Sequence, residues 1–124
     1  TLRIVSKSDT TAGMESTSGA AQALEEFVRQ AEEAGASDIH LAHEPGRVRI
    51  ELRLDGELTP IRDLPLAEGE RLCGRIKYLA RLKTYQESLP QDGRISRAEL
   101  NARCDVRVST YPAIHGEKIV LRLF

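Results

Sequence analysis

The segment Arg47–Leu54 alternates charged and apolar side chains at every position. A period of two places all four apolar side chains on one face of a β-strand and the charged ones on the other. Asp55-Gly56 follows, a pair that tolerates the positive φ of a two-residue hairpin turn. We expect Glu57–Arg62 to return as an edge strand, because Pro60 cannot donate to a central ladder. The chain must therefore build an antiparallel sheet with one buried face and one charged face.

Two amphipathic helices and four further strands are predicted around this hairpin. An apolar stripe through Phe27 predicts a helix from about Ser18 that ends at Gly35, and a stripe through Ile76 predicts a second helix over residues 67–85. Alternation predicts strands over residues 38–44, 94–100, 103–110 and 117–124. Because the strands cluster around the helices instead of alternating with them, we expect an α+β domain: a mainly antiparallel sheet of about six strands, with helices packed on one face.

Composition narrows the class of protein. With 124 residues and a net charge of −1, the chain has the size of one domain and lacks the positive charge of a dedicated nucleic-acid binder. Residues 1–18 are rich in Ser, Thr and Gly and are expected to be a flexible leader or linker, so that the domain comprises residues 19–124. Two cysteines make no disulfide framework and indicate a reduced, cytoplasmic setting. No apolar run approaches the ~20 residues of a membrane span.

The sequence carries no recognisable catalytic or metal-binding motif. It lacks the Gly-x4-Gly-Lys-Ser/Thr loop that cradles nucleotide phosphates. His40 and His43 lie three apart in a predicted strand and therefore on opposite faces, while Cys73 and Cys104 have no paired ligand spacing. No local signature marks an activated Ser or Cys nucleophile. We expect no metal site and no catalysis by this chain alone.

The arginines of the last two predicted strands are the strongest candidates for a binding site. Arg107 and Arg122 alternate with the apolar sets of their strands and therefore face away from the core. Only a pairing in which the two residue numbers add to an odd sum keeps both apolar sets together. The register expected through a loop at residues 111–116 pairs Thr110 with Glu117, Arg107 with Val120, and Asp105 with Arg122.

Two interpretations of these arginines stay open on the pattern alone. The first is a structural ion pair across the strands, Asp105 with Arg122 or with Arg107, worth ~0.2–1 kcal/mol. The second is an anion site, because two guanidiniums on one rigid face suit phosphate better than lysines do.

Six short segments, taken in order, resemble one protein family. They are Ala36–Pro45 (ASDIHLAHEP), Arg53–Leu58 (RLDGEL), Arg75–Leu82 (RIKYLARL), Leu89–Ile95 (LPQDGRI), Asp105–Thr110 (DVRVST) and His115–Leu123 (HGEKIVLRL). Over about residues 20–124, this ordered set resembles the middle domain of the type II secretion and type IV pilus assembly ATPases. Departures at Lys83–Tyr85 and at Ser88 leave the subfamily open between secretion, pilus extension and DNA uptake.

The resemblance implies a small PAS-like domain that is joined to an ATPase core beyond residue 124. It also implies a homohexamer, in which each middle domain packs near a neighbouring subunit's ATPase domain, at the cytoplasmic side of an inner-membrane secretion or pilus platform. ATP and Mg²⁺ are the implied cofactors of the whole protein, with none expected in this chain alone. Arg107 and Arg122 stand at positions whose arginines reach the ATP phosphates, and Arg94 is a third candidate.

Two other functions remain alternatives. A free-standing PAS-like sensor or protein-interaction module would bind a small ligand in the sheet. A nucleic-acid-binding domain would use the basic helix at residues 71–83, but the near-neutral charge and the five aromatic residues argue against it. A phosphate-binding loop within the few dozen residues after Phe124 would distinguish the motor from the sensor.

Overall fold

The computed structural model describes residues 17–124. The predicted leader lies outside this range, apart from Thr17 and Ser18, which begin the first helix. The elements in chain order are α1 (Thr17–Ala34), β2 (Asp38–Glu44), β3 (Arg47–Leu54), β4 (Glu57–Pro65), α2 (Leu66–Leu79), β5 (Gln91–Ile95), α3 (Arg97–Leu100), β6 (Val106–Ala113) and β7 (Gly116–Leu123).

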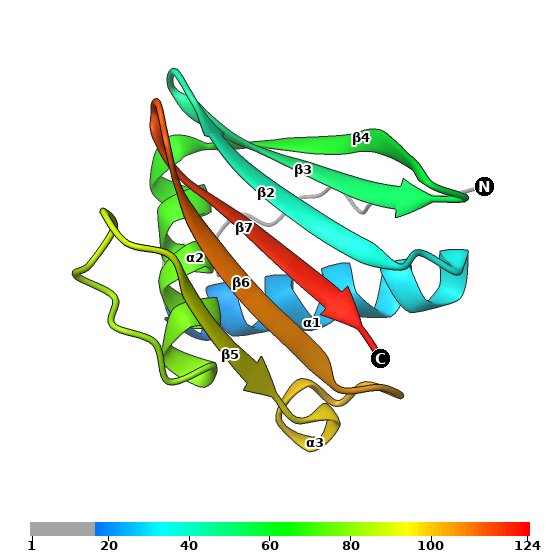
Figure 1. Ribbon diagram of the computed structural model, residues 1–124. Coiled ribbons are helices and arrows are strands. Elements are labelled where there is room, and N and C mark those ends of the chain that lie inside the picture. Colours follow the sequence, from blue (N-terminus) through cyan, green and yellow to red (C-terminus); the bar gives the residue numbers. More distant parts are fainter. Residues whose placement is uncertain (1–16) are drawn as a thin grey trace.

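The six strands form one antiparallel sheet in the order β4-β3-β2-β7-β6-β5 (Figure 1). Strands β2 to β4 are one three-stranded meander and strands β5 to β7 are another, with α2 connecting them along the chain. The two meanders join where β2 pairs with β7 at the centre of the sheet. The predicted α+β class, with six antiparallel strands, is therefore confirmed.

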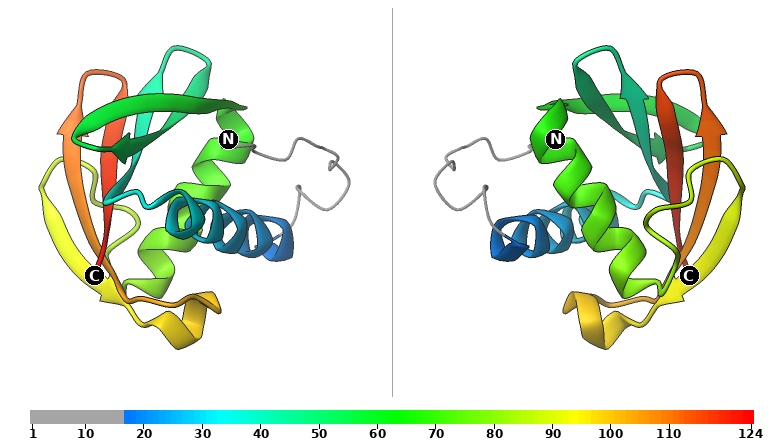
Figure 2. Two further views of the ribbon diagram at one scale, coloured as in Figure 1. Left: turned by 90° about the vertical axis from the view of Figure 1, so that its right-hand side faces the viewer. Right: turned by 90° about the vertical axis from the view of Figure 1, so that its left-hand side faces the viewer.

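Helices α1 and α2 cross each other on one face of the sheet and leave the other face open (Figure 2). The core lies between these layers, where Phe27 and Val28 of α1 and Ile76 of α2 meet Ile50 of β3 and Leu121 of β7. The alternation of β3 appears directly in its burial, because its apolar side chains point to the helices and its charged ones to the open face. The hydrophobic pattern thus fixes which side of every strand is available for binding.

The edge strand β4 is longer than predicted and reaches Pro65. Its pairing with β3 shifts between Ile50 and Glu51, where Pro60 and Arg62 are consecutive partners and Ile61 is the extra residue of a bulge. A bulge at an edge accommodates a proline that cannot donate to the ladder. The prediction that Pro60 marks an edge strand is confirmed.

Three predicted elements have wrong boundaries. The strand expected over residues 103–110 is β6, which begins only at Val106 and continues to Ala113. The helix expected over residues 67–85 ends at Leu79, because Arg81 adopts a left-handed φ of 62° and closes the helix. The strand expected over residues 94–100 is instead β5, which ends at Ile95, followed by the one-turn helix α3. Ser96 and Glu99 form the Ser-x-x-Glu pattern that opens helices, and their side chains are hydrogen-bonded over 3.3 Å.

The hairpin register between β6 and β7 also differs from the expected one. The strands continue to Ala113 and Gly116, so the turn consists of only two residues. Thr110 therefore pairs with Ile119, and Arg107 pairs with Arg122, which is a shift of two residues from the prediction. A shift of two preserves the face of every side chain, so the predicted orientation of both arginines is still correct.

Candidate anion-binding site

Five charged residues lie in one line across the open face of the sheet, each from a different strand. Arg53 is the partner of Asp38, Asp38 of Arg122, Arg122 of Arg107, and Arg107 of Arg94. We call this line the arginine row. It brings together all three arginines that the sequence singled out, which lie on the three successive strands β5, β6 and β7. From Arg94 to Arg122 it spans two strand spacings, about 10 Å.

The like charges of the arginine row destabilise this part of the sheet. Like charges placed directly opposite each other on neighbouring strands are destabilising. Here Arg122, Arg107 and Arg94 are consecutive cross-strand neighbours, and the row holds four guanidiniums against one carboxylate. Departures of this kind from local stability rules are expected at functional sites. The geometry therefore supports an anion-binding surface more strongly than a purely structural role.

Arg107 is the least engaged member of the row. Its side chain is exposed at the middle of β6. Within residues 17–124, no carboxylate lies in ion-pair range of its guanidinium and no side-chain hydrogen bond holds it. Because the side chain is exposed and unpaired in this range, its guanidinium is available to an anion.

Arg122 and Arg94 flank Arg107 and are partly held. Arg122 Nε donates to Asp38 Oδ1 over 2.9 Å, which raises the pKa of Arg122, while 65% of the Arg122 side chain stays exposed. The guanidinium of Arg94 lies over the ring of Phe124, 5.2 Å from its centre, and 3.6 Å from Asp105 Oδ2. Both arginines thus have a partner on one side and remain largely exposed, at 65% for Arg122 and 66% for Arg94.

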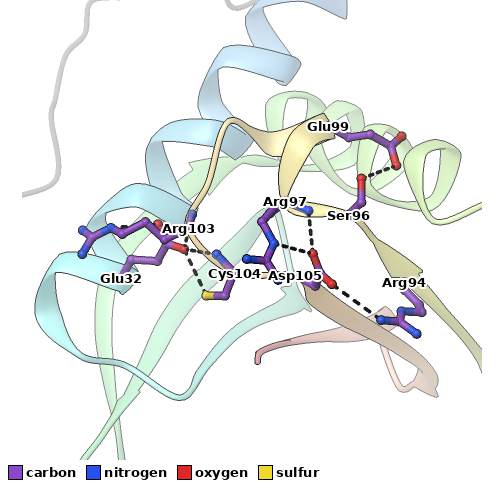
Figure 3. A network of polar contacts seen from close by, with 8 residues as sticks. All are labelled: Glu32, Arg94, Ser96, Arg97, Glu99, Arg103, Cys104 and Asp105. Atoms are coloured by element: carbon purple, nitrogen blue, oxygen red, sulfur yellow. Dashed lines mark hydrogen bonds and ion pairs between the residues drawn. The ribbon is translucent and has the colours of Figure 1, made fainter.

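Asp105, which lies just before the start of β6, belongs to a second network (Figure 3). Its Oδ1 accepts from the backbone N–H of Arg97 over 2.8 Å and from Arg97 Nε over 3.2 Å. The Arg97 backbone bond is the main reason that the pKa of Asp105 is lowered. Asp105 therefore orders α3 and Arg94, and the predicted ion pair of Asp105 with Arg122 or Arg107 is wrong.

The same network is tied to α1 by a carboxylate. Glu32 Oε2 accepts from the backbone N–H groups of Arg103 and Cys104, both over 2.9 Å, and from Cys104 Sγ (Figure 3). Burial would raise the pKa of Glu32, but the bonds from Cys104 and Arg103 outweigh it and lower the pKa. Burial, together with Glu32, raises the pKa of Cys104 to about 11, so this thiol is not an activated nucleophile.

Sequence reasoning missed Arg53, Asp38 and the neighbouring His40. Asp38 and His40 stand on β2, whose alternation places both on the open face, yet their side chains are only 1% and 7% exposed. Within the described chain, neither ring nitrogen of His40 has a hydrogen-bond partner. The alternation of β2 could have given their face, but not their neighbours, because the pairing of β2 with β7 spans more than seventy residues of chain.

Other kinds of site find no support in the described part of the chain. Among residues 17–124, no three His, Cys, Asp or Glu side chains gather closely enough to hold a metal ion. No helix in that range combines the length and the apolar content that a bilayer-spanning segment requires.

Comparisons with known proteins show the family of the chain. The family model described as "Type II/IV secretion system protein" matches residues 14–124. The chain therefore belongs to the type II/IV secretion system protein family. The predicted resemblance to secretion and pilus assembly ATPases is confirmed at the level of the family.

Two curated relatives and one solved structure illustrate the relationship. The type IV pilus assembly ATPase PilB of Thermus thermophilus is 36% identical over 106 residues, 86% of this chain and 12% of PilB. A putative type II secretion system protein E of Escherichia coli is 44% identical over 88 residues, 71% of this chain and 18% of that protein. The pilus retraction motor PilT with bound ADP matches 80% of this chain and 28% of its own, at a TM-score of 0.57 and 21% identity, which shows a common fold. The chain thus spans less than a fifth of the length of these two curated relatives.

Proposed function

We propose that this domain supplies arginines to the phosphates of ATP in a hexameric secretion or pilus-assembly ATPase. The nucleotide, with Mg²⁺, is bound by an ATPase core outside this chain, and the arginine row approaches it when neighbouring subunits close. Two findings support the proposal: membership of a family with relatives named as pilus assembly ATPases, and the line of Arg94, Arg107 and Arg122 across the open face. The arginine row is the single observation that carries it.

The chemistry of phosphoryl transfer fits such a surface. Negative charge on the phosphate oxygens is stabilised best by donors that are already in place and need no solvent rearrangement. Arg107 offers an uncommitted guanidinium, and its two neighbours are fixed by Asp38 and by Asp105 with Phe124. A planar fork also matches phosphate oxygens better than an ammonium does. The three side chains would bind and orient the phosphates, and the domain's movement would couple hydrolysis to secretion or pilus assembly.

The proposal includes the setting of the whole protein. It acts on the cytoplasmic side of the inner membrane, with the secretion or pilus platform and neighbouring subunits as partners. The chain alone should bind ATP weakly and show no turnover, because exposed arginines without backbone donors or Mg²⁺ make a poor phosphate site and the sequence has no phosphate-binding loop.

The test is steady-state ATP hydrolysis by the full-length protein with Arg122→Ala and Arg122→Lys. Removing a guanidinium that acts on transferring phosphate is expected to lower kcat by roughly 10³-fold or more. Lysine should recover only part of the loss, because it keeps the charge and loses the fork. Wild-type kcat in an assembled Arg122→Ala hexamer would leave the structural ion pair with Asp38 as the better account of Arg122.

A further inference from the structure

Asp38 is a buried carboxylate on the face of the sheet that no helix covers. It begins β2, one of the two central strands, and its side chain is 1% exposed. A charged group removed from water is costly unless hydrogen bonds and opposite charges compensate it. The arginines on both neighbouring strands provide that compensation and bury the carboxylate beneath them.

These two arginines are held in different ways. Arg53 donates Nε to Asp38 Oδ2 over 3.1 Å and Nη1 to the backbone carbonyl of Gly56 over 2.9 Å, so both sides of its guanidinium are committed. Arg122 donates Nε to Oδ1 over 2.9 Å and Nη2 to Oδ2 over 3.5 Å. Asp38 therefore engages Arg122 along one edge only, and leaves the outer end of this guanidinium in solvent.

We propose that Asp38 is a positioning residue for Arg122: it fixes the side edge of the guanidinium so that the outer fork faces the phosphates of ATP. This inference rests on the function proposed above. A guanidinium can present one pair of N–H groups to a carboxylate and still offer further donors to a second anion. Arg53, with both sides committed, acts as the support of Asp38 and has no part in binding phosphate.

Repulsion explains why Arg122 needs such support. Its direct neighbour on β6 is Arg107, and in the absence of a carboxylate the two like charges would drive the Arg122 side chain away from the row. Asp38 holds Arg122 at the β2 side, on the strand next to the one that carries Arg107. Misplacement of a catalytic group by about 1 Å can cost about 10²-fold in rate.

The surroundings of Asp38 keep it charged for this role. Burial alone would raise the pKa of Asp38, but hydrogen bonds and charges from Arg122 and Arg53 outweigh it, so the pKa lies below its usual value. His40 Nε2 is 3.9 Å from Oδ2. Burial, with Lys118 and Arg53 nearby, lowers the pKa of His40, so the imidazole is neutral at pH 7 and leaves the carboxylate to the two arginines.

The first experiment replaces Asp38 by asparagine in the full-length ATPase. Asp38→Asn keeps the shape of the side chain and removes the charge that holds Arg122. We expect kcat to fall by about 10- to 100-fold, with a smaller change in KM, because the geometry at the phosphates is lost rather than the bulk of nucleotide binding. Asp63→Asn is the matched control: Asp63 also lies beside two arginines, Arg49 at 3.4 Å and Arg47 at 3.9 Å, but outside the arginine row, and kcat should stay unchanged.

A double-mutant cycle separates positioning from general damage. In an Arg122→Ala background, Asp38→Asn should cause no further loss of kcat, because the residue it positions is absent. An equal loss in both backgrounds overturns the proposal and assigns Asp38 a structural role. If Asp38→Asn does not assemble, Asp38→Glu carries the same cycle, since it keeps the charge and displaces it by one methylene.

The outcomes also distinguish this inference from the proposed function. If Arg122→Ala lowers kcat and Asp38→Asn does not, the arginine acts on phosphate and only the positioning role of Asp38 is refuted. If Arg122→Ala itself has the wild-type kcat, the phosphate role of Arg122 is refuted, and the positioning role with it.

Discussion

Strand β7 carries charged side chains on both faces of the sheet, and Glu117 and Arg122, one from each face, are held in opposite ways. Glu117 points to the helices, where Oε1 lies 2.6 Å from Lys77 Nζ, and both side chains are 3% exposed. Arg122 points to the open face, where a buried Asp38 holds a guanidinium that is 65% exposed. The first pair is closed and can act only within the fold. In the second pair only the carboxylate is buried, so the charge of Arg122 is held in place and is still accessible to a partner.

The closed pair should give the largest effect on stability. Lys77→Met leaves Glu117 buried without its partner, and removing one member of a buried pair costs about 3–5 kcal/mol. Urea unfolding of the chain measures this as a lower free energy of unfolding. The double variant Lys77→Met with Glu117→Leu should recover most of the loss, because it leaves no unpaired charge in the core. A loss below about 1 kcal/mol for Lys77→Met alone would show that the pair is not buried as described.

The packing of the helix-covered face is tested at Gly69. A Cβ at this position would collide with the side chain of Val48, so α2 approaches β3 too closely for any larger residue. Gly69→Ala is expected to cost about 1–3 kcal/mol of unfolding free energy through overpacking. Gly74→Ala, in the same helix, meets no atom within 4 Å and should stabilise by about 0.5–1 kcal/mol through helix propensity. Equal effects of the two substitutions would contradict the close approach.

The open face should show a pH dependence that arises from His40. Burial, Lys118 and Arg53 lower the pKa of His40 in the folded chain below the value of about 6.5 that it has when unfolded. The unfolded chain therefore binds more protons between these two pKa values, and stability should decrease as the pH falls below about 6.5. His40→Gln should flatten this part of the curve. An unchanged slope in the variant would assign the pH dependence to other groups.

The smallest effect on stability is expected at Arg107. It has no ion pair within residues 17–124 and lies between two other arginines, so Arg107→Ala should change the free energy of unfolding by less than ~0.5 kcal/mol, or raise it slightly. Thermal or urea unfolding measures this directly. A loss above about 1 kcal/mol would mean that Arg107 has a structural partner after all.

The sequence predicted which face of the sheet each side chain occupies better than it predicted which residues are neighbours across the strands. Alternation placed Arg107 and Arg122 on the exposed side and Val108 and Leu121 in the core, because a period of two is a local property of a strand. The register of β6 with β7 was wrong by two residues, since the loop was expected at residues 111–116 while the strands in fact continue to Ala113 and Gly116. Local rules do not specify the length of such a turn.

The parts of the site that sequence could not provide depend on long-range pairing. Asp38 meets Arg122 because β2 and β7 are neighbours at the centre of the sheet, a contact between opposite ends of the domain. Nothing in either segment alone indicates this partner. The helix α3, by contrast, could have been recognised from Ser96 and Glu99, whose spacing is typical of a helix start.

The most direct measurement of the central claim is ATP hydrolysis by full-length Arg107→Ala at saturating ATP, beside Arg49→Ala. Arg49 lies on the same face of the sheet but outside the arginine row, where it pairs with Asp63 and Glu44. The account predicts that Arg107→Ala lowers kcat by roughly 10³-fold or more while its hexamer and melting temperature match the wild type, and that Arg49→Ala retains the wild-type kcat. Wild-type turnover in an assembled Arg107→Ala hexamer, or an equal loss in both variants, would contradict it.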